Sequence, residues 1–119
     1  MKIHIHEINN KKIAEIISDE TEIRETQDAL DIMANCDYQG SRKIVLREKH
    51  LSPVFFDLKT GMAGEILQKF SNYNVQLAII GNYSEIASKS LKDFIYESNK
   101  TGRICFVPSF DEAVKKMTA

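Results

Sequence analysis

Three short apolar runs, each followed by a segment with helical spacing, most strongly constrain the fold of this chain. The runs lie at residues 44–46, 75–81 and 103–107, and the last two also include the polar residues Gln76 and Arg103. A short, continuously apolar run is typical of a strand that is buried on both faces, as strands of parallel sheets are. Three strand–helix units in succession therefore predict parallel strands joined by helices that cover the sheet.

The start of the chain adds a different pattern. Residues 2–8 alternate between apolar and polar, which is typical of a half-buried strand. Asn9 and Asn10 tolerate a positive φ and suit a tight hairpin turn, after which Ile13, Ile16 and Ile17 predict a second strand. We therefore expect an α/β fold over residues 1–119, one domain with a mixed sheet of about five strands, a leading β-hairpin and about four helices.

Capping residues predict where the helices begin and end. We expect Thr26 to cap a helix that ends before Gly40, and Ser52-Pro53 to start a short helical turn. A third helix should follow Thr60. Ser84 is expected to cap the next helix, which Gly102 ends, and Ser109 or Asp111 should open the last one.

Charge and targeting signals narrow the class of protein. The 16 Lys and Arg residues are balanced by 17 Asp and Glu residues, whereas nucleic-acid binders usually carry a basic excess. No apolar stretch is long enough for a signal peptide or a membrane-spanning helix. Cys36 and Cys105 are expected to be reduced, buried residues. We expect a cytoplasmic protein that binds neither nucleic acid nor membrane.

No catalytic or cofactor motif stands out. Lys59-Thr60 lacks the upstream glycine of a phosphate-binding P-loop, and no dinucleotide-binding glycine pattern occurs. His4 and His6 share one face of the first strand, but their spacing fits no common zinc motif. The sequence therefore predicts no cofactor, no metal and no enzymatic activity.

The segment around Thr60 is the first candidate site, and its residues are Asp57, Lys59, Thr60, Gly61 and Gly64. Thr60 precedes a predicted helix, so its hydroxyl could lie beside unpaired backbone N–H groups, where a phosphate would be favoured. The simpler interpretation is that Thr60 only caps the helix and that the glycines allow close packing.

The carboxyl ends of the parallel strands are the second candidate site, because ligands of such sheets gather there. Two of these ends lead into residues 48–52 and 81–84. They would form a crevice for a polar or anionic metabolite, lined by Glu48, His50, Asn82, Tyr83 and Ser84.

Three longer stretches resemble a bacterial family called domain of unknown function 4180, over nearly the whole chain. They are Gln27 to Asn35, Phe55 to Phe70 followed by Asn72-Tyr73, and Ser88 to Asn99. The family name carries no assigned activity.

The strand order and the run from Phe56-Asp57 to Gly64 are also similar to STAS domains, which include the anti-sigma-factor antagonists. In that family a phosphorylatable Ser or Thr lies at the start of the second helix, and Thr60-Gly61 matches that dipeptide. The resemblance implies a STAS-like fold and a regulatory role.

We therefore expect a regulatory module that binds an unknown partner protein around Thr60 and is switched by phosphorylation of Thr60. The alternative is a sensor of a small molecule that binds at the carboxyl ends of the strands. The exposed edge of the leading hairpin could also pair with a second copy across a two-fold axis.

Overall fold

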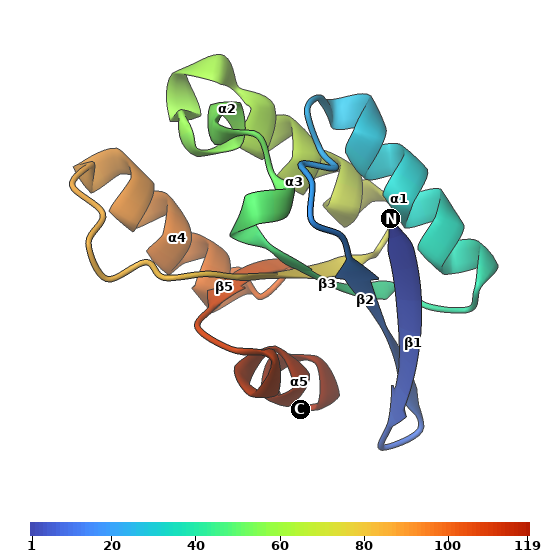
Figure 1. Ribbon diagram of the computed structural model, residues 1–119. Helices are drawn as coiled ribbons and strands as arrows, with labels where there is room; N and C mark the ends of the chain where they lie inside the picture. Colours follow the sequence, from blue (N-terminus) through green and yellow to red (C-terminus); the bar gives the residue numbers. More distant parts are fainter.

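The five strands lie in the sheet in the same order as in the chain (Figure 1). The computed structural model describes all residues, 1–119. The first two strands are antiparallel, and every later neighbour is parallel, which confirms the predicted mixed sheet with a leading hairpin. The strands are β1 (Lys2–Ile8), β2 (Lys11–Ile17), β3 (Lys43–Arg47), β4 (Gln76–Ile80) and β5 (Ile104–Val107).

Asn9 and Asn10 form the turn between β1 and β2. Both residues have positive φ angles, 53° and 65°, as the tight two-residue hairpin requires. The register pairs Ile8 with Lys11 directly beside this turn. Asparagine tolerates the left-handed region better than most residues, so the expected hairpin forms without glycine.

Five helices cover the sheet: four longer ones, in agreement with the expected number, and the short helix Pro53–Phe56, which begins at the predicted Ser52-Pro53. In Figure 1 α1, α2, α3 and α4 lie on one side of the sheet and α5 lies on the other. None of them has both the length and the apolar character needed to cross a bilayer. The helices are α1 (Thr26–Tyr38), α2 (Pro53–Phe56), α3 (Met62–Asn72), α4 (Lys89–Thr101) and α5 (Phe110–Thr118).

The strand order explains this unequal covering. Each crossover between parallel strands moves one position in the same direction, and right-handed crossovers then place their helices on the same face. The larger core, of 20 buried residues, lies on that face, and a second cluster of 7 lies on the other, where Ala113 and Met117 of α5 cover Val45 and Ala78. Cys36 and Cys105 are both free and buried, as expected.

Two predicted helix starts are wrong. Thr26 is the first residue of α1, with Glu25 at the N-cap position, and its hydroxyl donates to the Glu65 carboxylate (2.8 Å). Helix α4 begins at Lys89 and is capped by Ser88, so Ser84 lies in a loop. The other boundaries agree: Ser52 and Ser109 cap α2 and α5, and Gly102 ends α4.

The edge strand β5 is covered by a side-chain amide. The Val107 carbonyl accepts from the N–H of Gly81, which directly follows β4. Because successive residues of a strand alternate in direction, the neighbouring Phe106 directs its own N–H and C=O away from β4. There Asn99 of α4 binds both groups: its Oδ1 accepts from the Phe106 N–H (2.7 Å) and its Nδ2 donates to the Phe106 carbonyl (3.3 Å). The amide thus takes the place of a further strand at this position.

Candidate functional site

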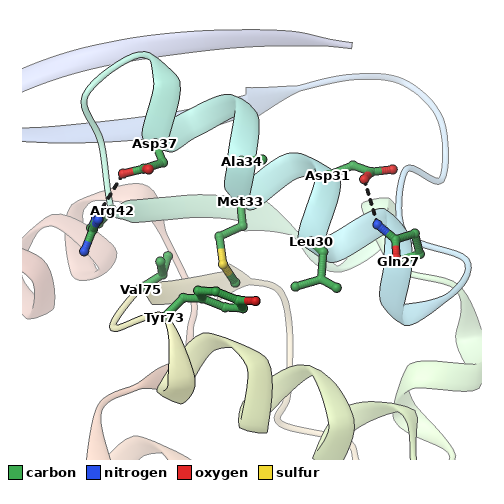
Figure 2. Close-up of a pocket in the computed structure, with 9 residues that line it drawn as sticks. All are labelled: Gln27, Leu30, Asp31, Met33, Ala34, Asp37, Arg42, Tyr73 and Val75. Carbon is green, nitrogen blue, oxygen red and sulfur yellow. Dashed lines mark hydrogen bonds and ion pairs between the residues drawn. The ribbon is translucent and has the colours of Figure 1, made fainter.

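A groove lies between α1 and the end of α3, and most of the residues that line it are hydrophobic (Figure 2). Its volume is about 410 Å³. Figure 2 shows Leu30 and Met33 of α1 directed at the ring of Tyr73, which caps the end of α3. We call this the α1–α3 groove; its lining is Gln27, Leu30, Asp31, Met33, Ala34, Asp37, Arg42, Tyr73 and Val75.

Tyr73 gives the groove its exposed apolar surface. Tyr73 is 58% exposed, whereas its neighbours Val75 and Met33 are buried, with exposed fractions of only 2% and 5%. Helix α1 presents Leu30, Met33 and Ala34 along this side because residues three and four apart share a helix face. The groove therefore combines a floor of buried residues with one large side chain that solvent can reach.

Charged side chains form the rim of the groove. Arg42 binds the Asp37 carboxylate (2.9 Å), and the Gln27 amide binds Asp31 (2.9 Å), as Figure 2 shows. Both carboxylates stay exposed, so each keeps a side that faces solvent. A ligand entering the groove would meet apolar atoms at the bottom and, at the edge, two carboxylates, one guanidinium group and one amide.

A second hollow, of about 450 Å³, begins at Gln27 and extends past the first turn of α3. It includes Thr60 and the 45%-exposed Val54, together with Glu25 and Glu65. We call it the Thr60 hollow; the rest of its lining is Arg24, Thr26, Gln27 and Met62. Both hollows include Gln27, so they lie next to each other, with Tyr73 lining the first and Thr60 the second.

The hydroxyl of Thr60 is already engaged by the backbone. Its proton is shared between the carbonyls of Val54 (2.9 Å) and Asp57 (2.8 Å), and its oxygen accepts from the Met62 N–H (3.3 Å). Thr60 therefore joins α2 to the start of α3. A phosphate on this oxygen would replace the donated proton and bring negative charge against two carbonyl oxygens.

The other residues of the Thr60 segment shape the same turn. Asp57 accepts from the Lys59 N–H (3.2 Å), and Gly61 has a φ of +79°, which a residue with a Cβ rarely adopts. Gly64 lies in the first turn of α3, and a Cβ there would meet no atom within 4 Å. The structure thus places Asp57, Lys59, Thr60 and Gly61 in one turn and Gly64 in the helix that follows, where close packing does not require a glycine.

We expect Thr60→Val to lower the free energy of unfolding by about 1 kcal/mol, because valine keeps the shape but loses the hydroxyl bonds. Urea unfolding of the purified variant measures this loss. Thr60→Ser is the matched control, since it restores the hydroxyl and should recover most of the stability. Equal stability of the valine variant and the wild type would contradict the structural role of this hydroxyl.

The predicted strand-end residues lie in two places. Arg47 pairs with Ile80 in the sheet, so Glu48 and Gly81 leave it side by side. A Cβ on Gly81 would come within 2.7 Å of the Glu48 carboxyl carbon and 2.8 Å of the Tyr83 hydroxyl, so both groups close over this glycine. Burial, assisted by the nearby Glu48 charge, raises the pKa of Tyr83, whose hydroxyl donates to the Ile79 carbonyl (3.1 Å).

Asn82, Tyr83 and Ser84 line a crevice of about 540 Å³ at the carboxyl ends of β4 and β5. Asn82 accepts from both the N–H and the hydroxyl of Ser84, so the two side chains order the loop. We call this the strand-end crevice; Gly81, Ile95, Asn99, Phe106 and Pro108 complete its lining.

His50 does not line this crevice and is buried beneath the loop between β2 and α1, with only 1% of its surface exposed. Its Nδ1 accepts from the Arg47 N–H (3.0 Å), so Nε2 carries the proton and donates to the Ser18 carbonyl (2.9 Å). Burial lowers the pKa of His50 and outweighs the opposite effect of the Ser18 bond. Both ring nitrogens are therefore occupied by the chain itself.

His4 and His6 belong to a different cluster, on the side of the sheet that α5 covers. Their rings lie 4.3 Å apart, and the His6 Nε2 contacts the Glu15 carboxylate (2.8 Å). Arg47 binds the other oxygen of Glu15 (2.9 Å). Burial raises the pKa of Glu15, but the bonds to His6 and Arg47 outweigh it, and the net direction is downward.

The α1–α3 groove was missed by the sequence analysis. Leu30, Met33 and Ala34 have the spacing of core residues, and nothing local distinguishes a core face from a groove wall. One signal was available: Tyr73, a large aromatic residue directly after a predicted helix and followed by Asn74. Aromatic residues with both apolar and polar ends are enriched in binding surfaces.

The fold is that of a small α/β protein with a five-stranded mixed sheet and five helices. A family model described as a domain of unknown function (DUF4180) matches residues 8–117. The chain belongs to this family. No curated protein and no solved structure matches it, so the STAS-like similarity stays a prediction.

Proposed function

We propose that this protein is a protein-interaction module that binds an amphipathic helix of a partner in the α1–α3 groove. The observation that carries the proposal is the exposed ring of Tyr73 over the apolar floor formed by Leu30 and Met33. Helices bind such grooves through apolar residues spaced three and four apart. Aromatic anchors of this kind supply much of the binding energy of interfaces.

The charge around the groove indicates the chemistry of the partner. The α1–α3 groove and the Thr60 hollow together carry four carboxylates, those of Glu25, Asp31, Asp37 and Glu65, against two guanidinium groups. Complementary charge steers association and excludes unsuitable partners. The proposed partner helix therefore has an apolar stripe flanked by lysine or arginine residues.

Thr60 supplies a way to regulate this binding. Phosphorylation would remove the hydrogen bonds that join Val54 and Asp57 to the start of α3 and would add charge to an acidic depression. In this proposal, phosphorylation rearranges the Thr60 hollow of the protein, and the basic partner helix binds to this rearranged surface. Thr60→Glu and Thr60→Val should then change the affinity for the partner, whereas Thr60→Ser should not.

Photo-crosslinking in cells tests the proposal. A photoreactive amino acid replaces Tyr73 in one sample and Tyr96 in another, because Tyr96 is similarly exposed (61%) but lies on α4 outside the groove. We expect a defined product only from position 73. Its crosslinked peptide should be a basic amphipathic helix, and a synthetic copy should bind the purified protein but not the Leu30→Arg variant.

Two results would contradict the proposal. One is recovery of the same proteins from positions 73 and 96, since nothing would then distinguish the groove from other exposed surface. The other is a crosslinked peptide that binds Leu30→Arg as tightly as the wild type. Circular dichroism of each variant ensures that a loss of binding does not result from unfolding.

The strand-end crevice favours a second function, sensing of a polar metabolite. Its position at the carboxyl ends of β4 and β5 is where ligands of parallel sheets bind, and it is lined by Asn82, Ser84 and Asn99. Thermal unfolding with a panel of nucleotides, sugar phosphates and amino acids tests this function. A ligand of this crevice should raise the Tm of the wild type but not that of Asn82→Ala.

A further inference from the structure

The two edges of the sheet differ in a way that points to self-association. At the β5 edge, Asn99 occupies the outward backbone groups of Phe106, and α4 packs against the strand. At the other edge, β1 makes its extensive contacts with β2, and it is the outermost strand in Figure 1. An uncovered strand of seven residues without proline is a template for pairing with another strand.

The hairpin register identifies the free backbone groups. In a two-residue hairpin the residues beside the turn, Ile8 and Lys11, form a hydrogen-bonded pair, and such pairs alternate along the strands. Even-numbered residues of β1 therefore direct their N–H and C=O toward β2. Ile3, Ile5 and Glu7 direct theirs outward, where β1 has no neighbouring strand.

The side chains of β1 are self-complementary. Ile3 and Ile5 lie on the side of the sheet that carries the larger core, and both pack partly buried against that core. When two copies pair antiparallel with His4 opposite His4 of the second copy, Ile3 lies opposite Ile5 in both halves. Cross-strand apolar pairs of this kind stabilise antiparallel strands.

We propose that two copies of this chain pair through β1, antiparallel and with His4 on the two-fold axis, to form one continuous sheet. The outward groups of Ile3 and Ile5 then form the hydrogen-bonded pairs on both sides of the axis. An axis perpendicular to the sheet keeps the α1–α3 grooves of both copies on the same face. The pairing uses a different surface from the proposed partner site and is independent of it.

Disulfide trapping tests the pairing. In this register the two His4 residues form a non-hydrogen-bonded pair with Cα atoms about 4.5 Å apart, so His4→Cys should crosslink under mild oxidation. Lys2→Cys is the control, because the same register separates its two copies by about 13 Å along the strands. The two natural cysteines are buried and should contribute no crosslink.

Sedimentation equilibrium of the unmodified protein provides the second measurement, with an expected mass of about twice the 13.6 kDa chain. Ile5→Pro removes an N–H that points away from β2 and makes no bond within the hairpin. The variant should therefore be monomeric and should keep the circular dichroism spectrum of the folded protein. A monomer at all concentrations, or crosslinking of Lys2→Cys as readily as His4→Cys, would overturn the proposal.

Discussion

Replacing His50 with alanine is expected to lower the free energy of unfolding by about 3 kcal/mol. The ring is buried and joins Arg47, at the end of β3, to Ser18, at the end of β2. Its loss leaves a backbone N–H and a carbonyl without their partners, at about 1–3 kcal/mol for each unsatisfied buried group. Urea unfolding at pH 7.5 measures the change.

The same contacts make stability depend on pH. The folded protein requires the neutral ring, since Nδ1 must accept from the Arg47 N–H, and burial holds the pKa of His50 below its usual value. The unfolded chain takes up the proton at about pH 6.5. The contribution of the neutral His50 ring to the free energy of unfolding is therefore complete above about pH 6.5. It is lost as the pH falls from there through the lower pKa of the folded state, and the free energy of unfolding then decreases by up to about 1.4 kcal/mol per pH unit.

His50→Gln separates this effect from other titrating groups. Glutamine offers an acceptor and a donor but does not titrate, so the fall in stability between pH 7.5 and pH 5 should be smaller in the variant. His4 and His6 are present in both proteins and cancel in the comparison. An equal pH dependence in the two proteins would show that His50 does not need to stay neutral.

Replacing Asn99 with alanine is expected to lower the free energy of unfolding by about 2 kcal/mol and to promote self-association through β5. Asn99 binds both outward backbone groups of Phe106, and alanine leaves them unpaired at the edge of the sheet. An uncovered edge is a site of strand pairing. Urea unfolding measures the loss of stability, and light scattering during heating measures the association.

Asn99→Asp is the matched variant. Its carboxylate still accepts from the Phe106 N–H but no longer donates to the carbonyl, so its stability should lie between those of the wild type and Asn99→Ala. An alanine variant as stable and as monodisperse as Asn99→Asp would show that the amide does not protect the edge.

The fold was predictable because its strongest signals are local. The apolar runs around Ile44 and Leu77 need no knowledge of their neighbours to be recognised as buried strands, and Asn9-Asn10 specifies a hairpin by itself. Helix starts are less strongly specified by local sequence. Ser84 and Ser88 are both capable caps, and the choice between them depends on the loop that Asn82 orders and on the packing of α4 against β5.

The candidate site was less predictable than the fold because it depends on which elements meet. The sequence places the Thr60 segment in one turn, and the structure has it there. Whether Tyr73 faces solvent or core, however, depends on the position of α3 relative to α1, which no local pattern specifies. The sequence shows His50 only as a polar residue after a strand. The loop between β2 and α1 packs over it, and this packing buries the ring and places it between Arg47 and Ser18.

The sequential strand order also bears on how the chain reaches its fold. Each strand pairs with one that precedes it in the chain, so the sheet can grow in the direction of synthesis, with modest loop-closure entropy at each step. Helix α5 follows β5, so the face beneath it cannot be covered until the whole sheet has formed. Val45, Ala78 and Cys105 lie on that face. A ribosome-bound nascent chain that ends before α5 should therefore expose this apolar strip to chaperones until the last helix emerges.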